Sequence, residues 1–239
     1  MDIATFTEND IKNSVVKEYG LAFLLRTLTE RSGLKTAIET ASPRYNKQIF
    51  AIASHLAACN DPFMYCQQWL SETDSTDDAG DLSSQRISEI LSEISFAERE
   101  SFYREWCKIR SESEYLALDV TSVSSYSELI DDVEWGHNRD NENLAQVNLC
   151  MLMGETSRLP IYQTVYSGSL KDVSTLNSTL AKFDAVTSGK SVLTVMDKGF
   201  CSKKNIDSLL FGKKGFIYHG GIVFLWLSQR IRSKANART

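Results

Sequence analysis

The sequence predicts an α/β domain that follows an all-α N-terminal region, with the change near residue 110. Up to that point apolar residues recur at three- and four-residue spacing, which is typical of helices that bury one face. From Tyr115 onward, short runs of apolar and β-branched residues alternate with turn-like segments and two helical patterns. The order of three strands, a helix, a strand, a helix and a strand favours a layered α/β arrangement.

Four segments of the N-terminal region have a clear local pattern. The apolar spacing of Val15 to Leu28 and of Lys47 to Ala58 predicts buried helices. The acidic, small-residue stretch Ser71 to Asp81 has the composition of a loop. Leu82 to Arg110 repeats apolar residues on one helical face, which predicts one long helix or two helices joined near Ser95.

The polar residues that open this last segment have two interpretations. Gln85 and Arg86 carry side chains that can make paired hydrogen bonds to base edges, as a DNA-reading helix requires. The same residues also suit the solvated side of any amphipathic helix. Both interpretations remain open from the sequence.

Each element after residue 110 has a local signal. Gly154 to Ser157 has turn composition, and Asp172 is placed to cap the helix that follows it. The near-continuous apolar run of the fourth strand predicts that both of its faces are covered. We predict strands at Tyr115–Thr121, Ala145–Met153 and Leu159–Tyr166, a helix at Asp172–Val186, a strand at Ser191–Met196, a helix at Lys203–Leu210 and a strand at Gly215–His219.

The composition is that of a globular protein without export or membrane signals. Hydrophobic residues make up 42% of the 239 positions, enough to bury a core. The acidic first ten residues do not resemble a secretory signal, and the apolar run Ile222 to Leu227 is too short to cross a bilayer. The five cysteines are scattered without metal-ligand spacing. We therefore expect a cytoplasmic protein that does not contact a membrane.

The net charge of −5 is unevenly distributed along the chain. From Lys198 onward there are nine Lys or Arg residues and a single acid, Asp207, so the rest of the chain is strongly acidic. An acidic surface repels nucleic acid, and any phosphate contacts in that part must come from local basic patches.

Two aspartates are the strongest candidates for chemistry. Asp119 follows the apolar Leu116-Ala-Leu, and Asp197 follows the apolar run that ends at Met196, so we expect buried or half-buried carboxylates at two strand ends. If the strands are neighbours, the carboxylates converge, and a divalent cation would relieve their repulsion. The alternative for each is a structural role, capping a turn or pairing with a lysine such as Lys198.

In order and spacing, these residues match a known pattern. Leu116-Ala-Leu-Asp119-Val-Thr-Ser resembles the first-acid motif of DDE-type insertion-sequence transposases, whose core is ribonuclease-H-like, and Val195-Met-Asp197-Lys-Gly-Phe200 resembles their second-acid motif. Between the two, Trp135-Gly-His-Asn-Arg139-Asp140, Gln146-Val-Asn148-Leu and Gly168-Ser-Leu-Lys-Asp172 fall in the order typical of the family.

The resemblance implies metal-dependent cleavage and transfer of DNA strands. Asp119 and Asp197 would hold Mg²⁺ or Mn²⁺, and Thr121 and Ser122 would orient the strand end or touch the DNA backbone. Arg139 and Lys198 would meet phosphate, although Arg139 also suits a pair with Asp140. The implied partners are the terminal inverted repeats of the element and target DNA, bound by a homodimer in a bacterial or archaeal cell.

The family pattern breaks after the second aspartate. Its third acid is a Glu on a later helix, and the sequence has no Glu after Asp197. We therefore expect three parts, namely a helical and possibly DNA-binding region (residues 1–110), a partial catalytic core (residues 111–220) and a basic tail (residues 221–239) that is a genuine helix or the product of a frameshifted or prematurely ended gene. Whether the chain is an enzyme stays open. Besides an incomplete or inactive transposase, the alternatives are a non-catalytic remnant that binds element ends, and another ribonuclease-H-like nuclease that uses Glu155 or Asp207 as its third acid.

Overall fold

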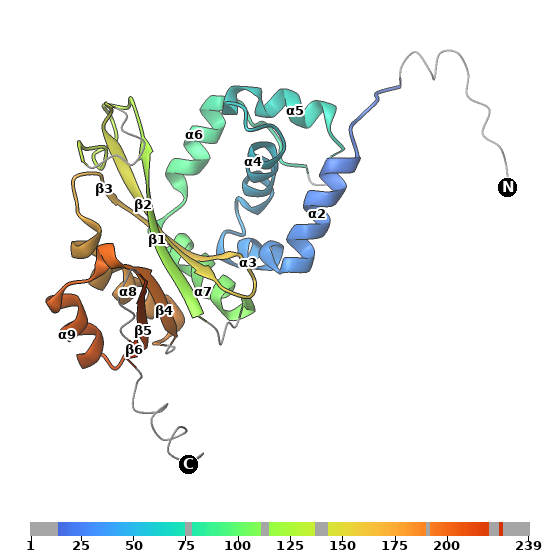
Figure 1. Cartoon of the computed structure of the whole chain (residues 1–239). Helices are drawn as coiled ribbons and strands as arrows, with labels where there is room; N and C mark the ends of the chain where they lie inside the picture. Colours follow the sequence, from blue (N-terminus) through green and yellow to red (C-terminus); the bar gives the residue numbers. More distant parts are fainter. Residues whose placement is uncertain are drawn as a thin grey trace. The chain divides into compact units, whose positions relative to one another are not determined.

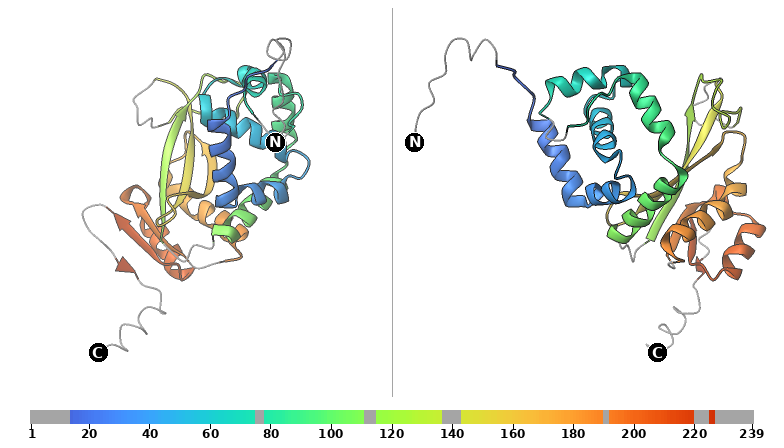
Figure 2. Two further views of the ribbon diagram at one scale, coloured as in Figure 1. Left: turned by 90° about the vertical axis from the view of Figure 1, so that its right-hand side faces the viewer. Right: turned by 180° about the vertical axis from the view of Figure 1, so that it is seen from behind.

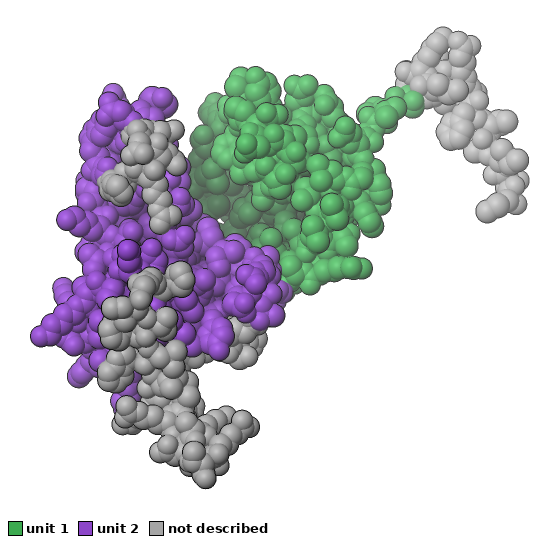
Figure 3. All heavy atoms as spheres, viewed as in Figure 1, with its two compact units in different colours: residues 1–105 green, residues 106–239 purple. Residues whose placement is uncertain are grey.

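The computed structural model divides the chain into two compact units, residues 1–105 and residues 106–239 (Figure 3). It describes the backbone and side chains of most of the chain, and the backbone alone at positions 219, 225 and 226. The described residues are 14–74, 78–110, 115–136, 143–189, 192–219 and 225–226.

The first unit is entirely helical in its regular structure (Figure 1). Its core is formed by buried side chains from three helices and the segments between them: Tyr45, Ala51, Ile52, Cys66, Ala79, Leu82, Ile87 and Ile90. Its elements are α2 (Gly20–Ser32), α3 (Leu34–Ala41), α4 (Asn46–Cys59), the 3₁₀ turn η1 (Phe63–Tyr65), α5 (Cys66–Glu72), α6 (Ser84–Glu93) and α7 (Phe96–Arg110), which continues into the second unit.

The first predicted helix is shifted and is not buried. Helix α2 begins at Gly20, and none of its residues is buried: Leu24 and Leu28 are 51% and 53% exposed. The described residues before it are not helical in the structure, and Glu18 forms a parallel bridge with Thr73. The prediction was wrong on burial because apolar spacing identifies a helical face without showing what covers it.

The segment from Leu82 to Arg110 forms two helices, which confirms the second of the two alternatives. Ser95 separates α6 from α7, and its hydroxyl accepts a hydrogen bond from the Glu98 amide at 3.2 Å. The Glu98 carboxylate accepts in return from the Ser95 amide at 2.8 Å. This reciprocal pair is a capping box, which satisfies amides that a helix start would leave open.

The second unit is built on a mixed sheet in the strand order β3-β2-β1-β4-β5-β6 (Figure 1). Strands β1 to β3 are antiparallel, β4 and β5 run parallel to β1, and β6 is antiparallel to β5. The elements are β1 (Tyr115–Ser124), β2 (Gln146–Gly154), β3 (Pro160–Ser167), α8 (Asp172–Thr187), β4 (Leu193–Asp197), the 3₁₀ turn η2 (Lys198–Phe200), α9 (Lys203–Phe211), β5 (Phe216–His219) and β6 (Leu225–Trp226). The predicted element order and the ribonuclease-H-like α/β fold class are confirmed.

Helices α8 and α9 pack against each other beside the sheet, as the rear view shows (Figure 2). Asn205 of α9 links them, since its amide donates to the Val173 carbonyl at 2.8 Å and accepts from Asn177 at 3.1 Å. Each fully buried aliphatic or aromatic side chain in this layer contributes roughly 1.5–3 kcal/mol. The buried residues of the sheet and α8 include Leu116, Leu118, Val120, Cys150, Leu152, Met196, Phe216, Leu176, Leu180 and Phe183.

Two local predictions in this unit were wrong. Strand β4 is not covered equally on both faces: Thr194 and Met196 are buried, whereas Leu193 and Val195 are half-buried. Asp172 is the first residue of α8 rather than its N-cap, which is Lys171. The Asp172 carboxylate instead accepts a hydrogen bond from the Tyr166 hydroxyl at 3.0 Å. Tyr166 lies near the end of β3, close to the start of α8.

Among the residues that the structure describes, no helix combines the length and apolar content needed to span a membrane.

Candidate active site

Asp119 and Asp197, here called the acid pair, lie at neighbouring positions of two parallel strands. Asp197 ends β4 as predicted, whereas Asp119 lies in the middle of β1, which continues to Ser124, so the predicted strand end at Asp119 was wrong. In the register of β1 with β4, Ala117 pairs with Val195 and Leu118 pairs with Met196, so the next position on each strand is an aspartate. Neighbouring strands are about 4.8 Å apart, and side chains alternate between faces with period two. The acid pair therefore shares one face of the sheet, opposite to the face that α8 covers.

Both aspartates are exposed, which contradicts the predicted burial. On β1 the inward positions are Leu116, Leu118 and Val120, so alternation turns Asp119 outward. Asp197 is the last residue of β4, directly after the buried Met196. An exposed carboxylate keeps its hydration, and no burial cost has to be offset at this site.

Local hydrogen bonds orient each carboxylate. An Asp119 oxygen accepts from the Val120 amide at 2.8 Å, and an Asp197 oxygen accepts from the Gly199 amide in the turn η2. A Cβ on residue 199 would lie 2.8 Å from that Asp197 oxygen. Any other residue at this position would therefore displace the carboxylate. A carboxylate has about four acceptor positions. The bond from the Gly199 amide occupies one of them, so Asp197 can still accept further bonds or bind a cation.

The donor set fits a hard divalent cation. Mg²⁺ prefers oxygen ligands and is usually held by one or two protein carboxylates, with water and substrate phosphate as the other ligands. The acid pair supplies two carboxylates from one face of one sheet. Within the described part of the chain, no group of three or more His, Cys, Asp or Glu residues is arranged to hold a metal ion.

The other residues predicted on β1 lie on different faces. Thr121 is exposed and is two residues beyond Asp119, on the same face. Ser122 is on the opposite face, where its hydroxyl donates to the Asn148 side chain at 3.4 Å. Lys198 is exposed directly after Asp197. Arg139 lies outside the described residues.

Gln85 and Arg86 open α6 in the first unit, and both side chains contact Glu89. The Gln85 amide donates to one Glu89 oxygen at 3.1 Å, and the Arg86 guanidinium donates to the other at 3.0 Å. The bond from Arg86 is the main reason why the pKa of Glu89 is lowered. A DNA phosphate or base would have to displace Glu89 from these two side chains.

The two alternative third acids do not join the acid pair. Glu155 follows β2, and its amide donates to the Tyr115 carbonyl at the opening of β1. Four residues separate Tyr115 from Asp119, about 13 Å along a strand. Asp207 is exposed on α9, two positions after the buried Asn205, and therefore points to the other side of the helix.

A buried polar cluster on the inward face of the sheet, opposite to the face of the acid pair, was not predicted as a site feature. Gln146 and Asn148 occupy inward positions of β2, at 0% and 5% exposure, where an apolar residue would be usual. The Asn148 amide donates to the carbonyls of Ser167, Gly168 and Leu170 at 3.3, 3.4 and 3.1 Å. Asn148 thereby holds the loop between β3 and α8. The sequence signal for this cluster was the presence of polar residues at alternate positions of the otherwise apolar strand β2.

This loop forms part of a cavity of about 550 Å³ next to the turn that follows Asp197. Its wall includes Val120, Ser122, Asn148, Lys171 and Gly199, from β1, β2, the turn after β4 and the start of α8.

Two glycines from the family-like motifs meet at the same place. A Cβ on Gly136 would lie 1.8 Å from the Gly168 carbonyl oxygen. A Cβ on Gly168 would lie 2.1 Å from the Gln146 carbonyl oxygen and 2.5 Å from that of Glu134. Real side chains do not approach backbone this closely, so the contact requires glycine at both positions.

Cys150 of β2 does not contribute a thiolate to this region. Burial raises the pKa of its thiol to about 11, so it is protonated at neutral pH.

Three comparisons with known proteins bear on the family of this chain. A search of curated protein sequences found no match. Among solved structures, the Mos1 transposase paired-end complex with left transposon end is similar over 69% of this chain, with 12% sequence identity and a TM-score of 0.32. The chain spans 56% of the length of that transposase chain. The family model described as the transposase DDE domain matches residues 110–235, more than half of the sequence and both aspartates of the acid pair. The chain therefore belongs to the transposase DDE domain family.

Proposed function

We propose that this protein is the transposase polypeptide of an insertion sequence and that its chemistry is metal-dependent phosphoryl transfer on DNA. The observation that carries the proposal is the placement of Asp119 beside Asp197, on one face of the sheet, within the region that the transposase family model matches. In the first step, water would hydrolyse a phosphodiester at the end of the element. The freed 3′-hydroxyl would then attack target DNA.

The acid pair would hold Mg²⁺ or Mn²⁺. When bound, such ions activate the attacking oxygen and stabilise the leaving one during in-line displacement. Gly199 keeps the Asp197 carboxylate in position through its amide. Thr121, on the face of Asp119, and the exposed Lys198 are placed to contact the DNA backbone beside the reacting phosphate. Arg139 is proposed for the same role from the sequence.

The other parts of the chain would serve DNA binding. We propose that residues 1–110 bind the terminal inverted repeats, that residues 111–220 form the core around the acid pair, and that the basic residues 221–239 add phosphate contacts. A homodimer would hold two element ends and the target. Gln85 and Arg86 would contribute once DNA displaces Glu89.

The two acids at the site favour a second candidate, a protein that binds element ends without cutting them. Among the residues that the structure describes, no third acid joins Asp119 and Asp197. Two ligands hold a metal less tightly and less rigidly than three. We therefore expect weak or absent cleavage by this polypeptide alone, with DNA binding retained.

The deciding experiment is cleavage of a labelled element-end duplex by the full chain in Mg²⁺ or Mn²⁺. Asp119→Asn and Asp197→Asn are the test variants, and Asp207→Asn is the matched control with the same charge change. Cleavage that is lost in both test variants and kept in the control supports the transposase reaction. Cleavage lost in Asp207→Asn would identify another nuclease with a different third acid.

A separate measurement follows the metal itself. Titration of Mn²⁺ by electron paramagnetic resonance reports binding without requiring turnover. We expect weaker binding in Asp119→Asn and Asp197→Asn than in Asp207→Asn. Equal Mn²⁺ binding in all three variants would exclude the acid pair as the metal site. DNA binding without cleavage in the unmodified chain would favour the non-catalytic candidate.

A further inference from the structure

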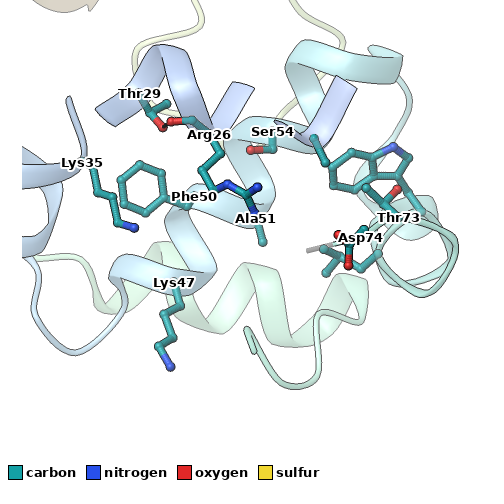
Figure 4. Close-up of a pocket in the computed structure, with 12 residues that line it drawn as sticks. Arg26, Thr29, Lys35, Lys47, Phe50, Ala51, Ser54, Thr73 and Asp74 are labelled. Carbon is teal, nitrogen blue, oxygen red and sulfur yellow. Dashed lines mark hydrogen bonds between the residues drawn. The ribbon is translucent and has the colours of Figure 1, made fainter. Parts of the chain in front are cut away.

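Helices α2 to α5 of the helical unit enclose a small pocket that is lined by three cations (Figure 4). Arg26 comes from α2, Lys35 from α3 and Lys47 from α4, so three separate helices each bring one positive charge. We call this the cation pocket. Its other lining residues are Ala22, Thr29, Phe50, Ala51, Ser54, Trp69, Leu70, Thr73 and Asp74.

The positive charge of the pocket exceeds its negative charge. Asp74 is the single acid among the lining residues. Lys35 lies 3.4 Å from the carboxylate of Glu30, whose side chain is 52% exposed. A long ion pair at the surface contributes little, and an incoming anion can replace Glu30 without a large loss.

The arrangement of the side chains suits one anion. In Figure 4, Arg26 reaches from α2 toward Ala51, and Lys35 lies beside the Phe50 ring. Lys47 is the most exposed of the three, and its ammonium points away from Arg26 in this view. The flexible four-carbon stem of lysine allows that ammonium to turn toward a bound anion.

The pocket's size selects the kind of anion. Its volume is about 60 Å³, the space of about two water molecules at roughly 30 Å³ each. A nucleobase cannot enter, whereas a phosphate group at the mouth can reach the cations. Arg, Lys and Ser side chains are the usual donors to phosphate oxygens in DNA complexes, and Ser54 adds a hydroxyl here.

The cation pocket differs in charge from the unit that surrounds it. In residues 1–105 the acidic residues outnumber the basic ones, so the unit as a whole repels DNA. At the start of α6, Gln85 and Arg86 are already engaged by Glu89. The cation pocket differs in that three cations from three helices line one site together with one acid.

We infer that the cation pocket binds one backbone phosphate of duplex DNA and thereby anchors the helical unit on the element end. The inference rests on the proposed function, because it takes DNA as the source of the phosphate. It assigns Arg26, Lys35 and Lys47 to DNA binding, in addition to the residues that the sequence suggested.

The test is the salt dependence of DNA binding by the full chain, measured by fluorescence anisotropy in EDTA so that catalysis plays no part. Each phosphate contact contributes about 0.9 to the slope of log affinity against log salt. The test variant is Lys35→Gln/Lys47→Gln. Its matched control is Arg31→Gln/Arg104→Gln, which removes the same charge from exposed positions of α2 and α7 outside the pocket.

We expect the test variant to lose part of the slope, up to about 0.9 in total, because both lysines serve the same phosphate and Arg26 still contacts it. The loss should be uniform across DNA sequences. The control variant and Lys35→Arg/Lys47→Arg should keep the slope of the unmodified chain. A loss of about 1.8 in the test variant would mean two separate phosphates, and no loss would mean that the pocket does not contact DNA. Either result overturns the inference, and neither bears on cleavage by the acid pair.

A second variant tests the pocket by gain of binding, which misfolding cannot mimic. Asp74→Asn removes the one acid of the lining, and DNA affinity should rise at low salt. Unchanged or weaker affinity would contradict the inference. Calorimetry with inorganic phosphate alone separates the sources: phosphate binding that Lys35→Gln/Lys47→Gln abolishes, together with an unchanged DNA slope, would assign the pocket to free phosphate instead of DNA.

Discussion

Replacing Asn148 by alanine should loosen the loop between β3 and α8. Asn148 is 5% exposed, and its amide nitrogen donates to three carbonyls, those of Ser167, Gly168 and Leu170. Its side-chain oxygen accepts from the Gln146 amide at 3.3 Å and from the Ser122 hydroxyl at 3.4 Å. One small side chain therefore connects β1, β2 and the approach to α8.

The magnitude follows from what the variant leaves behind. An amide nitrogen has two hydrogens, so at most two of the three carbonyl bonds are strong at once. A buried polar group that loses its partner costs about 1–3 kcal/mol, whereas a typical bond contributes about 0.5–1.5 kcal/mol net. We expect Asn148→Ala to lower the free energy of unfolding of the second unit by about 2–3 kcal/mol. That corresponds to a fall in Tm of roughly 5–10 °C for a domain of this size.

Two measurements check this prediction. Urea denaturation gives the change in unfolding free energy, and hydrogen exchange of the Gly168 and Leu170 amides reports local opening of the loop. Ser122→Ala is the matched control, since it removes one donor to the same Asn148 oxygen and should cost about 0.5–1 kcal/mol. A loss below about 1 kcal/mol in Asn148→Ala, or unchanged exchange in the loop, would refute the argument that Asn148 holds the loop.

Three further predictions concern single local contacts. Ser95→Ala removes the cap of α7 and should cost about 1 kcal/mol by urea denaturation; a cost equal to that of an exposed serine such as Ser92→Ala would contradict the capping role. The pKa of Glu98 is lowered, chiefly by the hydrogen bond from the Ser95 amide, so its contribution to stability is present above the unfolded value near 4.5 and is lost as the pH falls through the lower folded value. The urea midpoint of the helical unit should therefore drop below about pH 4.5, less so in Glu98→Gln, and an equal drop in both proteins would argue against it. Gly199→Ala should displace the Asp197 carboxylate and weaken Mn²⁺ binding at least several-fold; unchanged binding would show that the carboxylate accommodates a Cβ.

Much of the element order could be predicted because its signals are local. The change from helical to strand spacing near residue 110, and the strand predicted at Tyr115, depend on periodicity within about ten residues. The split near Ser95 also has a local cause, since the Ser95 and Glu98 side chains cap the helix that lies between them in sequence. Such contacts require no knowledge of distant residues.

The burial of Asp119 shows where the interpretation of a pattern failed although the signal was present. Leu116 and Leu118 alternate with the residues between them, and this parity already places Asp119 on the outer face. The apolar residues before Asp119 predicted a buried or half-buried carboxylate, and the parity of the strand shows why that prediction was wrong. Helix α2 is the opposite case, because its apolar residues gave no indication that the described chain would leave them uncovered.

The sequence by itself predicted Asp119 and Asp197 as the candidate residues for chemistry, and it determined the order of the elements that carry them, because local spacing and motif order encode both. The tertiary structure decided that β1 and β4 are neighbours, that Gly136 and Gly168 meet without room for a side chain, and that cations from α2, α3 and α4 face one pocket. These are contacts between segments far apart in the chain. They depend on which strands pair and which helices pack. The free energy that favours one such packing comes from contacts throughout the core, so no short stretch of residues encodes it.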